Sequence, residues 1–225
     1  MANKRTGVYG TYYGSYYTES EALTMAEMKV NAEYIYKSLT AQGWNIKGIS
    51  ALLGNMQAES TINAGRWQSD NVNNTSGGYG LVQWTPATKY TVWSIENGYS
   101  DPSEMDANLF RIVYELENGT QWIATNSYDY SFKTFATSTD KSVSELAKAF
   151  LLNYERPADQ SVSVQNYRSE LANTWYNYLM GEDIGSSEGG SGSGSQGSGI
   201  TKKKKGFNFI LFNRRRKQQW INKSI

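Results

Sequence analysis

The segment from Asn45 to Pro86, which reads NIKGISALLGNMQAESTINAGRWQSDNVNNTSGGYGLVQWTP, determines most of the fold prediction. It begins as a helix, because four apolar residues recur at spacings of three and four: Ile49, Leu52, Leu53 and Met56. The same stripe continues to Glu59. A carboxyl on the apolar face of a helix is costly to ionise, so it would keep a proton near neutral pH, as a general acid must. Ser60, Thr61 and Asn63 favour caps and turns, so the helix is expected to end beside Glu59.

A glycine-rich turn follows, Gly77-Gly78-Tyr79-Gly80, and leads into Leu81-Val82-Gln83-Trp84. Glycine lets the backbone approach a ligand closely. Gln83 can hydrogen-bond to a ligand, and aromatic rings can stack on it. Tyr79, Gln83 and Trp84 are therefore candidate substrate contacts, and core packing is the alternative for Trp84.

Two separated motifs, Glu59-Ser60 and Gly80-Leu81-Val82-Gln83, resemble the ES…GLxQ signature of the lysozyme and lytic transglycosylase superfamily. The longer string, with FLLNYERPA at residues 150–158, is similar to the lysozyme domain of tail-tip proteins of short-tailed phages that infect Gram-positive bacteria. The resemblance covers roughly residues 21–180. It implies that Glu59 is the general acid, that Gln83 lines the sugar cleft and that Tyr154 lies near the acid. Around Tyr154 the order Asn-Tyr-Glu departs from the Ala-Tyr-Asn of transglycosylases.

The chain has no Cys and no His among its 225 residues. These absences exclude disulfides, a Cys nucleophile, a Ser-His-Asp triad and a His-ligated zinc. Carboxylates remain as the principal groups for acid–base work near neutrality, which favours glycoside chemistry over peptide-bond chemistry. No metal or cofactor is expected.

A second carboxylate is harder to assign. Asp70 lies in a polar turn that would keep it ionised, so it could stabilise an oxocarbenium-like transition state, orient water or act as the nucleophile. An Asx turn or a cap is the alternative role for Asp70. Glu155 adjoins Arg156, and we expect either a structural ion pair or a direct catalytic role.

Further helices are predicted from their first residues. Thr24 and Glu27 form a capping box, and so do Ser142 and Glu145, whose helix should run to about Tyr154. Residues 101–104, Asp-Pro-Ser-Glu, predict another helix start.

The last helix should run roughly from Val164 to Met180 with five residues inward: Tyr167, Leu171, Trp175, Tyr178 and Leu179. The turn-rich residues 71–84 are the best place for a small β-hairpin. The predicted class is α+β: a helix-rich, lysozyme-like domain with a small hairpin, followed by a flexible linker and a basic tail.

Four regions are predicted: a Tyr/Gly-rich arm (1–20), the lysozyme-like catalytic domain (21–183), a Gly/Ser linker (184–200) and a basic aromatic tail (201–225). The arm is either flexible or a docking segment for a neighbouring subunit. Residues 1–188 hold 13 basic and 21 acidic side chains, a balance of −8, whereas residues 189–225 hold nine basic and none acidic. The tail is either a solvated extension, a docking segment for another tail subunit, or a contact for an anionic wall polymer or membrane surface. Nucleic acid is the less favoured partner.

The predicted function is cleavage of the β-1,4 bond between N-acetylmuramic acid and N-acetylglucosamine in peptidoglycan. Attack by the sugar's own 6-hydroxyl instead of water would make the protein a lytic transglycosylase. A glycan-binding tail component without activity is the alternative from another class. The resemblance implies a virion-borne enzyme among other phage tail proteins, opening the host wall during entry. No secretion signal is recognised, which also fits an endolysin.

Overall fold

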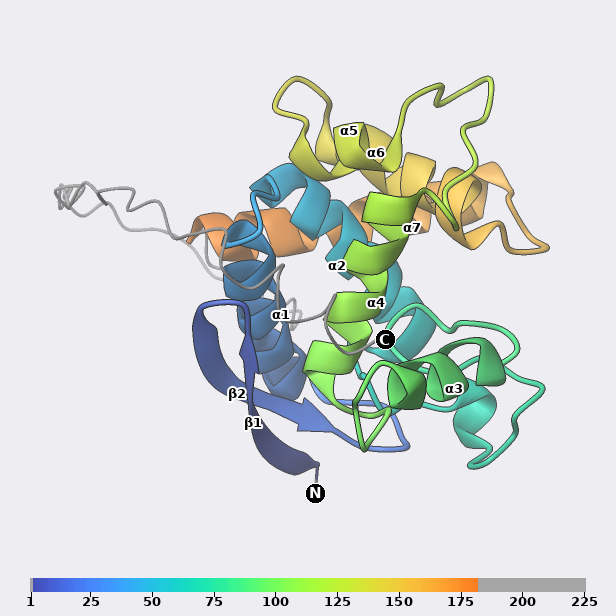
Figure 1. Ribbon diagram of the computed structural model, residues 1–225. Coiled ribbons are helices and arrows are strands. Elements are labelled where there is room, and N and C mark those ends of the chain that lie inside the picture. Colours follow the sequence, from blue (N-terminus) through green and yellow to red (C-terminus); the bar gives the residue numbers. More distant parts are fainter. Residues whose placement is uncertain (1, 182–225) are drawn as a thin grey trace, which may run out of the picture. The chain divides into compact units, whose positions relative to one another are not determined.

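The structure is a computed structural model that describes residues 2–181 (Figure 1). Its elements in chain order are β1 (Asn3–Tyr9), β2 (Tyr12–Thr18), α1 (Met25–Thr40), α2 (Ile46–Ser60), the 3-10 turn η1 (Gln68–Asp70), α3 (Thr88–Glu96), α4 (Met105–Asn118), α5 (Phe132–Thr137), α6 (Val143–Ala149), the π-helix η2 (Phe150–Glu155) and α7 (Val162–Met180). Within the described range, no helix is long and apolar enough to span a membrane. The predicted class, a helix-rich α+β domain with a small hairpin, is confirmed. The predicted linker and tail lie outside the described residues.

Helix α2 is central to the packing, because it contacts α1, α5, α6 and α7. The apolar stripe predicted for it is confirmed, since its four residues are fully buried: Ile49, Leu52, Leu53 and Met56. The closest crossing is with α7 and depends on Gly54, where a Cβ would lie 2.5 Å from the backbone nitrogen of Ala172. Protein interiors have no spare volume for such a clash. Gly54 therefore permits the α2–α7 packing that brings side chains of α7 to the end of α2.

The predicted helix starts are confirmed in two places and shifted in one. Thr24 and Glu27 form the full capping box of α1. Ser142 caps α6 by accepting from the Glu145 backbone N–H at 3.1 Å, while the Glu145 carboxylate pairs with Lys141 instead. Helix α4 begins only at Met105, later than the Asp-Pro-Ser-Glu pattern predicts. The Asp101 carboxylate is occupied by the Ser103 backbone and by Arg5, so residues 101–104 form a turn before the helix.

The small hairpin lies at the N-terminus, beside α1 (Figure 1). The prediction of a hairpin at residues 71–84 was wrong, because this segment contains only isolated bridges at Tyr79. The flexible arm expected for residues 1–20 is likewise replaced by β1 and β2. Asn31 of α1 holds strand β2 in place, since its side chain accepts from the Tyr17 backbone N–H at 2.6 Å and donates to the Tyr17 carbonyl at 2.8 Å. Tyr9 and Tyr16 of these strands are buried and add to the core, whereas Tyr13 is exposed.

Helix α7 is rotated relative to the predicted stripe. Of the five residues expected inward, only Trp175 is fully buried, and Tyr167 is exposed. Arg168 and Ala172 face α2 instead. A small residue is needed where Gly54 approaches, so Ala172 takes the contact and the neighbouring turn directs Arg168 toward Glu59. The rotation places a buried cation where the apolar pattern predicted a tyrosine.

Candidate active site

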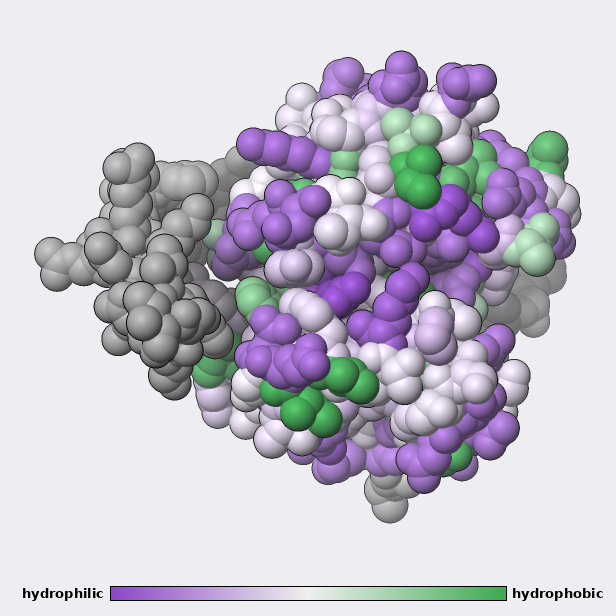
Figure 2. Space-filling view, turned by 45° about the vertical axis from the view of Figure 1, so that its right-hand side comes forward, coloured by the Kyte–Doolittle hydropathy of each residue, from purple (hydrophilic) through white to green (hydrophobic). Residues whose placement is uncertain are grey.

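A cavity of about 630 Å³ lies at the C-terminal end of α2. Its wall is contributed by Glu59, by Arg66, Gln68 and Ser69 of the following loop, by residues 82–85, and by residues 154–157, with Lys89 and Gln121. The lining is mainly polar, and the face of the molecule in Figure 2 is likewise mostly hydrophilic, with hydrophobic residues in small separate patches. Such a lining suits a ligand rich in hydroxyl and amide groups, because its polar side chains can fix the orientation of that ligand.

Glu59 is the penultimate residue of α2 and contributes its side chain, which is 22% exposed, to this wall. Its partner is Arg168 of α7, whose Nη2 donates to Glu59 Oε1. The other terminal nitrogen of Arg168, Nη1, donates to the Asn55 carbonyl at 2.8 Å. The prediction that Glu59 lies in apolar surroundings is therefore corrected, because an arginine from a distant part of the chain contacts its carboxylate.

Glu155 ends the π-helix η2 and provides a second carboxyl in the same wall. Its side chain is only 5% exposed, and neither of its oxygens meets a hydrogen-bond donor among the described residues. Arg168 Nη2 lies 3.7 Å from Glu155 Oε2. Burial raises the pKa of Glu155 well above its ordinary value, and the negative charge of Glu59 adds to this effect, while Arg168 opposes it. Its surroundings therefore favour the protonated, neutral form of the Glu155 carboxyl.

The ion pair suggested by the sequence between Glu155 and Arg156 does not form. Arg156 has a left-handed backbone, with φ of 50°, and its Nη1 donates to the Gln121 carbonyl at 2.8 Å and to the Asn153 carbonyl at 2.5 Å. These contacts turn the guanidinium toward the backbone of the preceding loop. The partner of Glu155 is instead Arg168. A π-helical turn of this kind frequently occurs at functional sites.

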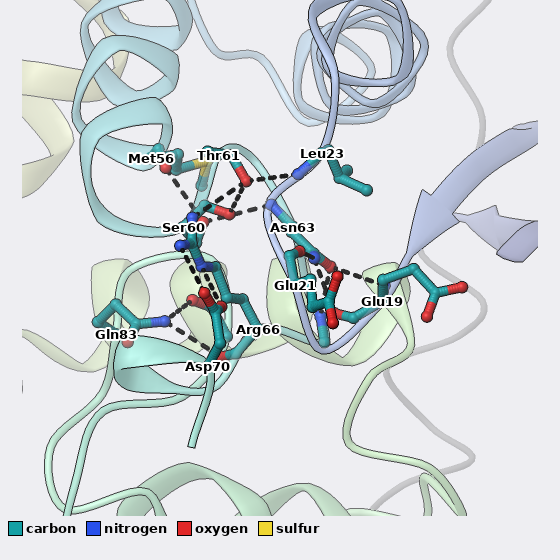
Figure 3. Close-up of polar contacts among 12 residues, drawn as sticks. Glu19, Glu21, Leu23, Met56, Ser60, Thr61, Asn63, Arg66, Asp70 and Gln83 are labelled. Carbon is teal, nitrogen blue, oxygen red and sulfur yellow. Dashed lines mark hydrogen bonds and ion pairs between the residues drawn. The ribbon is translucent and has the colours of Figure 1, made fainter. Parts of the chain in front are cut away.

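The two motifs that carry the resemblance are joined directly. Ser60 Oγ hydrogen-bonds to the carbonyls of Met56, at 3.0 Å, and Leu81, at 2.9 Å, which attaches the Gly80–Gln83 loop to the end of α2. Gln83 Nε2 donates to the carbonyls of Arg66, at 3.1 Å, and Gly80, at 2.9 Å (Figure 3). The Gln83 side-chain oxygen therefore remains as its polar atom for a ligand. Gly80 has φ of +82°, and a Cβ there would lie 2.6 Å from Asn108 Oδ1.

Asp70 lies just beyond the part of its loop that lines the cavity. Its carboxylate accepts from Arg66 Nε at 3.1 Å and Nη2 at 3.4 Å, and the side chain is 42% exposed (Figure 3). Ser69 and Gln68, beside it, do belong to the wall. The structure therefore brings Glu59 together with Glu155 in one wall, and leaves Asp70 paired with Arg66 at the edge of the loop.

The aromatic candidates divide into two groups. Tyr79 is buried between Trp67 and Tyr90, at ring-centroid distances of 4.5 and 6.0 Å, and does not line the cavity. Trp84 and Tyr154 are also buried, yet each contributes part of the wall. Trp84 stacks on Tyr90 with centroids 4.5 Å apart, which is the core packing considered as its alternative role.

A buried carboxylate that the sequence did not reveal connects Trp84 with Tyr154. Glu115 of α4 is only 1% exposed and accepts from Trp84 Nε1 at 3.1 Å, from the Tyr154 hydroxyl and from Arg111 Nε at 2.7 Å. Its position three residues after the buried Ile112 of the same helix was the signal for its burial. Glu115 holds the two aromatic residues of the cavity wall in place.

Two comparisons identify known proteins that are similar to this chain. Residues 30–179 match the family model described as phage tail lysozyme. Over 167 residues the chain is 47% identical to Morphogenesis protein 1 of Bacillus phage B103, which covers 74% of this chain and 44% of that protein. The chain thus spans less than half the length of the curated relative it matches. The description of the family places the chain in a phage tail, and both matches confirm the resemblance carried by the two motifs. The chain belongs to the phage tail lysozyme family.

Proposed function

We propose that this domain cleaves the β-1,4 bond between N-acetylmuramic acid and N-acetylglucosamine in peptidoglycan, as a tail component that opens the host wall locally during entry. The observation that carries the proposal is that Glu59 lines a polar cavity together with Gln83 of the Gly80–Gln83 loop. A glycan strand offers hydroxyl and amide groups that match this lining. Peptidoglycan is therefore the proposed partner, together with neighbouring proteins of the tail.

In this mechanism, Glu59 donates a proton to the glycosidic oxygen while the bond to the sugar carbon breaks. Positive charge then develops on the sugar ring, and water attacks it. General acid catalysis of this kind contributes roughly 10²–10⁴-fold to the rate. Gln83 is proposed to contact the sugar through its side-chain oxygen, and Trp84 and Tyr154 to shape the wall against which the sugar rests. Tyr79 would act indirectly, by supporting the loop.

Asp70 is retained as a candidate second carboxylate, because Gln68 and Ser69 beside it line the cavity. From there it would stabilise the charge on the sugar or orient water. Its carboxylate is engaged by Arg66 and does not itself line the cavity, which favours a second candidate reaction in which the sugar's own 6-hydroxyl attacks. That reaction is the one of a lytic transglycosylase, and it does not require a second carboxylate as nucleophile.

The deciding experiment is mass spectrometry of purified peptidoglycan digested with the protein. Hydrolysis produces reducing ends, and transglycosylation produces 1,6-anhydro ends. A protein that only binds glycan leaves the strands intact, which would refute the proposed activity. The Glu59→Gln protein, prepared in the same way, is the control for contaminating hydrolases.

A further inference from the structure

Glu59, Glu155 and Arg168 form a three-residue cluster from three separate elements: α2, η2 and α7. Both carboxyls lie on Nη2 of the same guanidinium, which donates to Glu59 Oε1 and lies 3.7 Å from Glu155 Oε2. Arg168 is itself buried. The Glu155 oxygens meet no donor among the described residues, although Glu59 is adjacent. Two neighbouring carboxyls can hydrogen-bond to each other only when one of them is protonated.

The charge of the cluster favours that protonated state. With both carboxyls ionised, one guanidinium faces two negative charges, and an excess of one negative charge is left in a largely buried site. An uncompensated buried charge is costly. One proton on the pair makes the cluster neutral and supplies the missing donor. Two carboxyls that share a site commonly hold a proton between them for this reason.

A general acid next to an arginine has a difficulty, because a nearby guanidinium favours the carboxylate over the acid. We propose that Glu155 is a positioning residue that keeps one proton on the Glu59–Glu155 pair against the effect of Arg168, so that Glu59 can deliver it to the glycosidic oxygen. This inference rests on the proposed function, and it assigns to Glu155 a role through Glu59 and not through contact with the reacting atoms.

The proton that the carboxyl pair gives up is regained by the end of the reaction. The proton leaves the pair through Glu59 and bonds to the glycosidic oxygen as the carbon–oxygen bond breaks, so the leaving sugar departs as an alcohol. The pair is then doubly ionised and faces Arg168 alone. Water, or the sugar's 6-hydroxyl, attacks the ring carbon and loses one proton, which returns to the pair. No oxidant, reductant or metal takes part in this cycle.

The ionisable groups that act on Glu155 are Glu59 from α2 and Arg168 from α7. Arg156, next to it, is engaged by the carbonyls of Gln121 and Asn153. Arg66 and Lys89 also line the cavity, and Arg66 is paired with Asp70. The proposal therefore predicts opposite effects for the two neighbours of Glu59. Removing Glu155 leaves Arg168 as the charge beside Glu59 and favours loss of the proton. Removing the charge of Arg168 takes away the group that opposes the proton on the carboxyl pair.

The test is the pH dependence of kcat/KM on soluble peptidoglycan glycan fragments, with melting temperatures recorded for every variant. In Glu155→Gln, the basic limb of the profile should move to lower pH by about one to three pH units, the usual effect of an unopposed neighbouring charge. In Arg168→Gln, it should move to higher pH. Glu170→Gln is the matched control, because Glu170 is an exposed carboxylate on the same helix as Arg168 and should leave the limb in place. Glu155→Asp keeps the carboxyl, so its basic limb should lie between those of Glu155→Gln and the wild type.

An unshifted limb in Glu155→Gln, or equal loss of activity at every pH, would overturn the proposal. If that variant does not fold, a carboxyl ¹³C NMR titration provides the second measurement. The Glu155 carboxyl should titrate at lower pH in Glu59→Gln than in the wild type, and an unchanged midpoint would overturn the proposal. The NMR result does not depend on activity. A wild-type protein that leaves glycan uncleaved would instead refute the proposed function, so the two failures are distinguishable.

Discussion

Arg168 and Glu59 form an ion pair between residues 109 positions apart in the chain, in which Arg168 Nη2 donates to Glu59 Oε1. The pair connects the middle of α7 to the end of α2 at the wall of the cavity. It fixes the carboxyl that the ES motif supplies, since Arg168 is also bound to the carbonyl of Asn55 one turn earlier in α2. A carboxyl held in this way has a defined orientation in the cavity wall, which the proposed proton transfer requires.

Glu59→Gln is expected to lower glycan cleavage by about 10²–10⁴-fold, because glutamine keeps the shape of the side chain but has no proton to give. Its amide oxygen can still accept from Arg168, so the melting temperature should change little. Release of soluble fragments from purified walls measures the activity, and Glu170→Gln is the control for the loss of one acidic residue. A loss smaller than about tenfold would remove Glu59 from the role of acid.

Asp70→Asn separates the roles considered for this residue. Because its carboxylate is paired with Arg66 and does not itself line the cavity, we expect activity to stay within about tenfold of the wild type. The lost pair is partly exposed and should cost at most about 1 kcal/mol of stability. Activity and chemical denaturation of the same preparation measure both effects. A loss of several orders of magnitude at unchanged stability would establish Asp70 as the second carboxylate of the reaction.

Glu155 should also affect how stability depends on pH. Burial, and secondly the charge of Glu59, raise the pKa of Glu155 in the folded protein, whereas an unfolded chain titrates near about 4.3. Between these two pKa values the folded state holds a proton that the unfolded state has lost, so the free energy of unfolding falls as pH rises. Glutamine at this position removes that dependence.

Glu155→Gln should therefore gain stability relative to the wild type as pH rises above about 4.3, by up to about 1.4 kcal/mol per pH unit until the raised pKa is passed. Urea denaturation at a series of pH values from 4 to 8, ~0.5 apart, measures the difference. The Glu170→Gln control should run parallel to the wild type. A difference between Glu155→Gln and the wild type that stays constant with pH would show that Glu155 has an ordinary titration.

Glu115→Ala is expected to destabilise the fold by roughly 3–5 kcal/mol, since it leaves Arg111 without its buried partner. Trp84 Nε1 and the Tyr154 hydroxyl lose their acceptor at the same time. Glu117→Ala, at an exposed position of the same helix, should stay within about 0.5 kcal/mol of the wild type. Chemical denaturation measures both variants. Equal stability of the two would mean that Glu115 does not support the wall.

Local sequence patterns were sufficient to predict the features that depend only on neighbouring residues. The apolar stripe of α2 and the capping box of Thr24 and Glu27 need only neighbouring residues, and both are confirmed. The predicted position of the hairpin was wrong because the backbone hydrogen bonds of residues 71–84 are made in single bridges and turns. Residues 3–18 form paired strands that are held by distant groups, Asn31 of α1 and Asp106 of α4.

The cavity wall was predicted on the side formed by Glu59 and the Gly80–Gln83 loop, which contains both motifs. The part of the wall that contains Glu155 depends on contacts between distant residues. The pattern of α7 predicted tyrosine and leucine inward, whereas the crossing at Gly54 selects the rotation that buries Arg168. The π-helical turn of η2 then brings Glu155 to the same guanidinium. No spacing in the sequence encodes these two effects, because each arises from packing between helices.

The basic residues 201–225 lie outside the described structure, and their charge leads to a prediction about binding. Removing residues 182–225 removes nine basic and three acidic side chains and leaves 13 basic against 18 acidic, a balance of −5. Residues 2–181 contain the packed core through α7, so folding and cleavage of soluble glycan fragments should persist. Many wall polymers and membrane surfaces are anionic, and they should repel the remaining acidic domain.

The shortened protein should therefore bind anionic vesicles and whole walls more weakly than the full chain at low salt, as measured by co-sedimentation. The difference should shrink above about 0.15 M salt, where the Debye length falls to about 8 Å. A full-length variant with glutamine in place of Lys202 to Lys205 and Arg214 to Lys217 is the matched control, because it keeps the length and the aromatic residues. It should behave like the shortened protein if charge is the cause. Equal binding by all three forms at low salt would exclude an anionic surface as the partner of these residues.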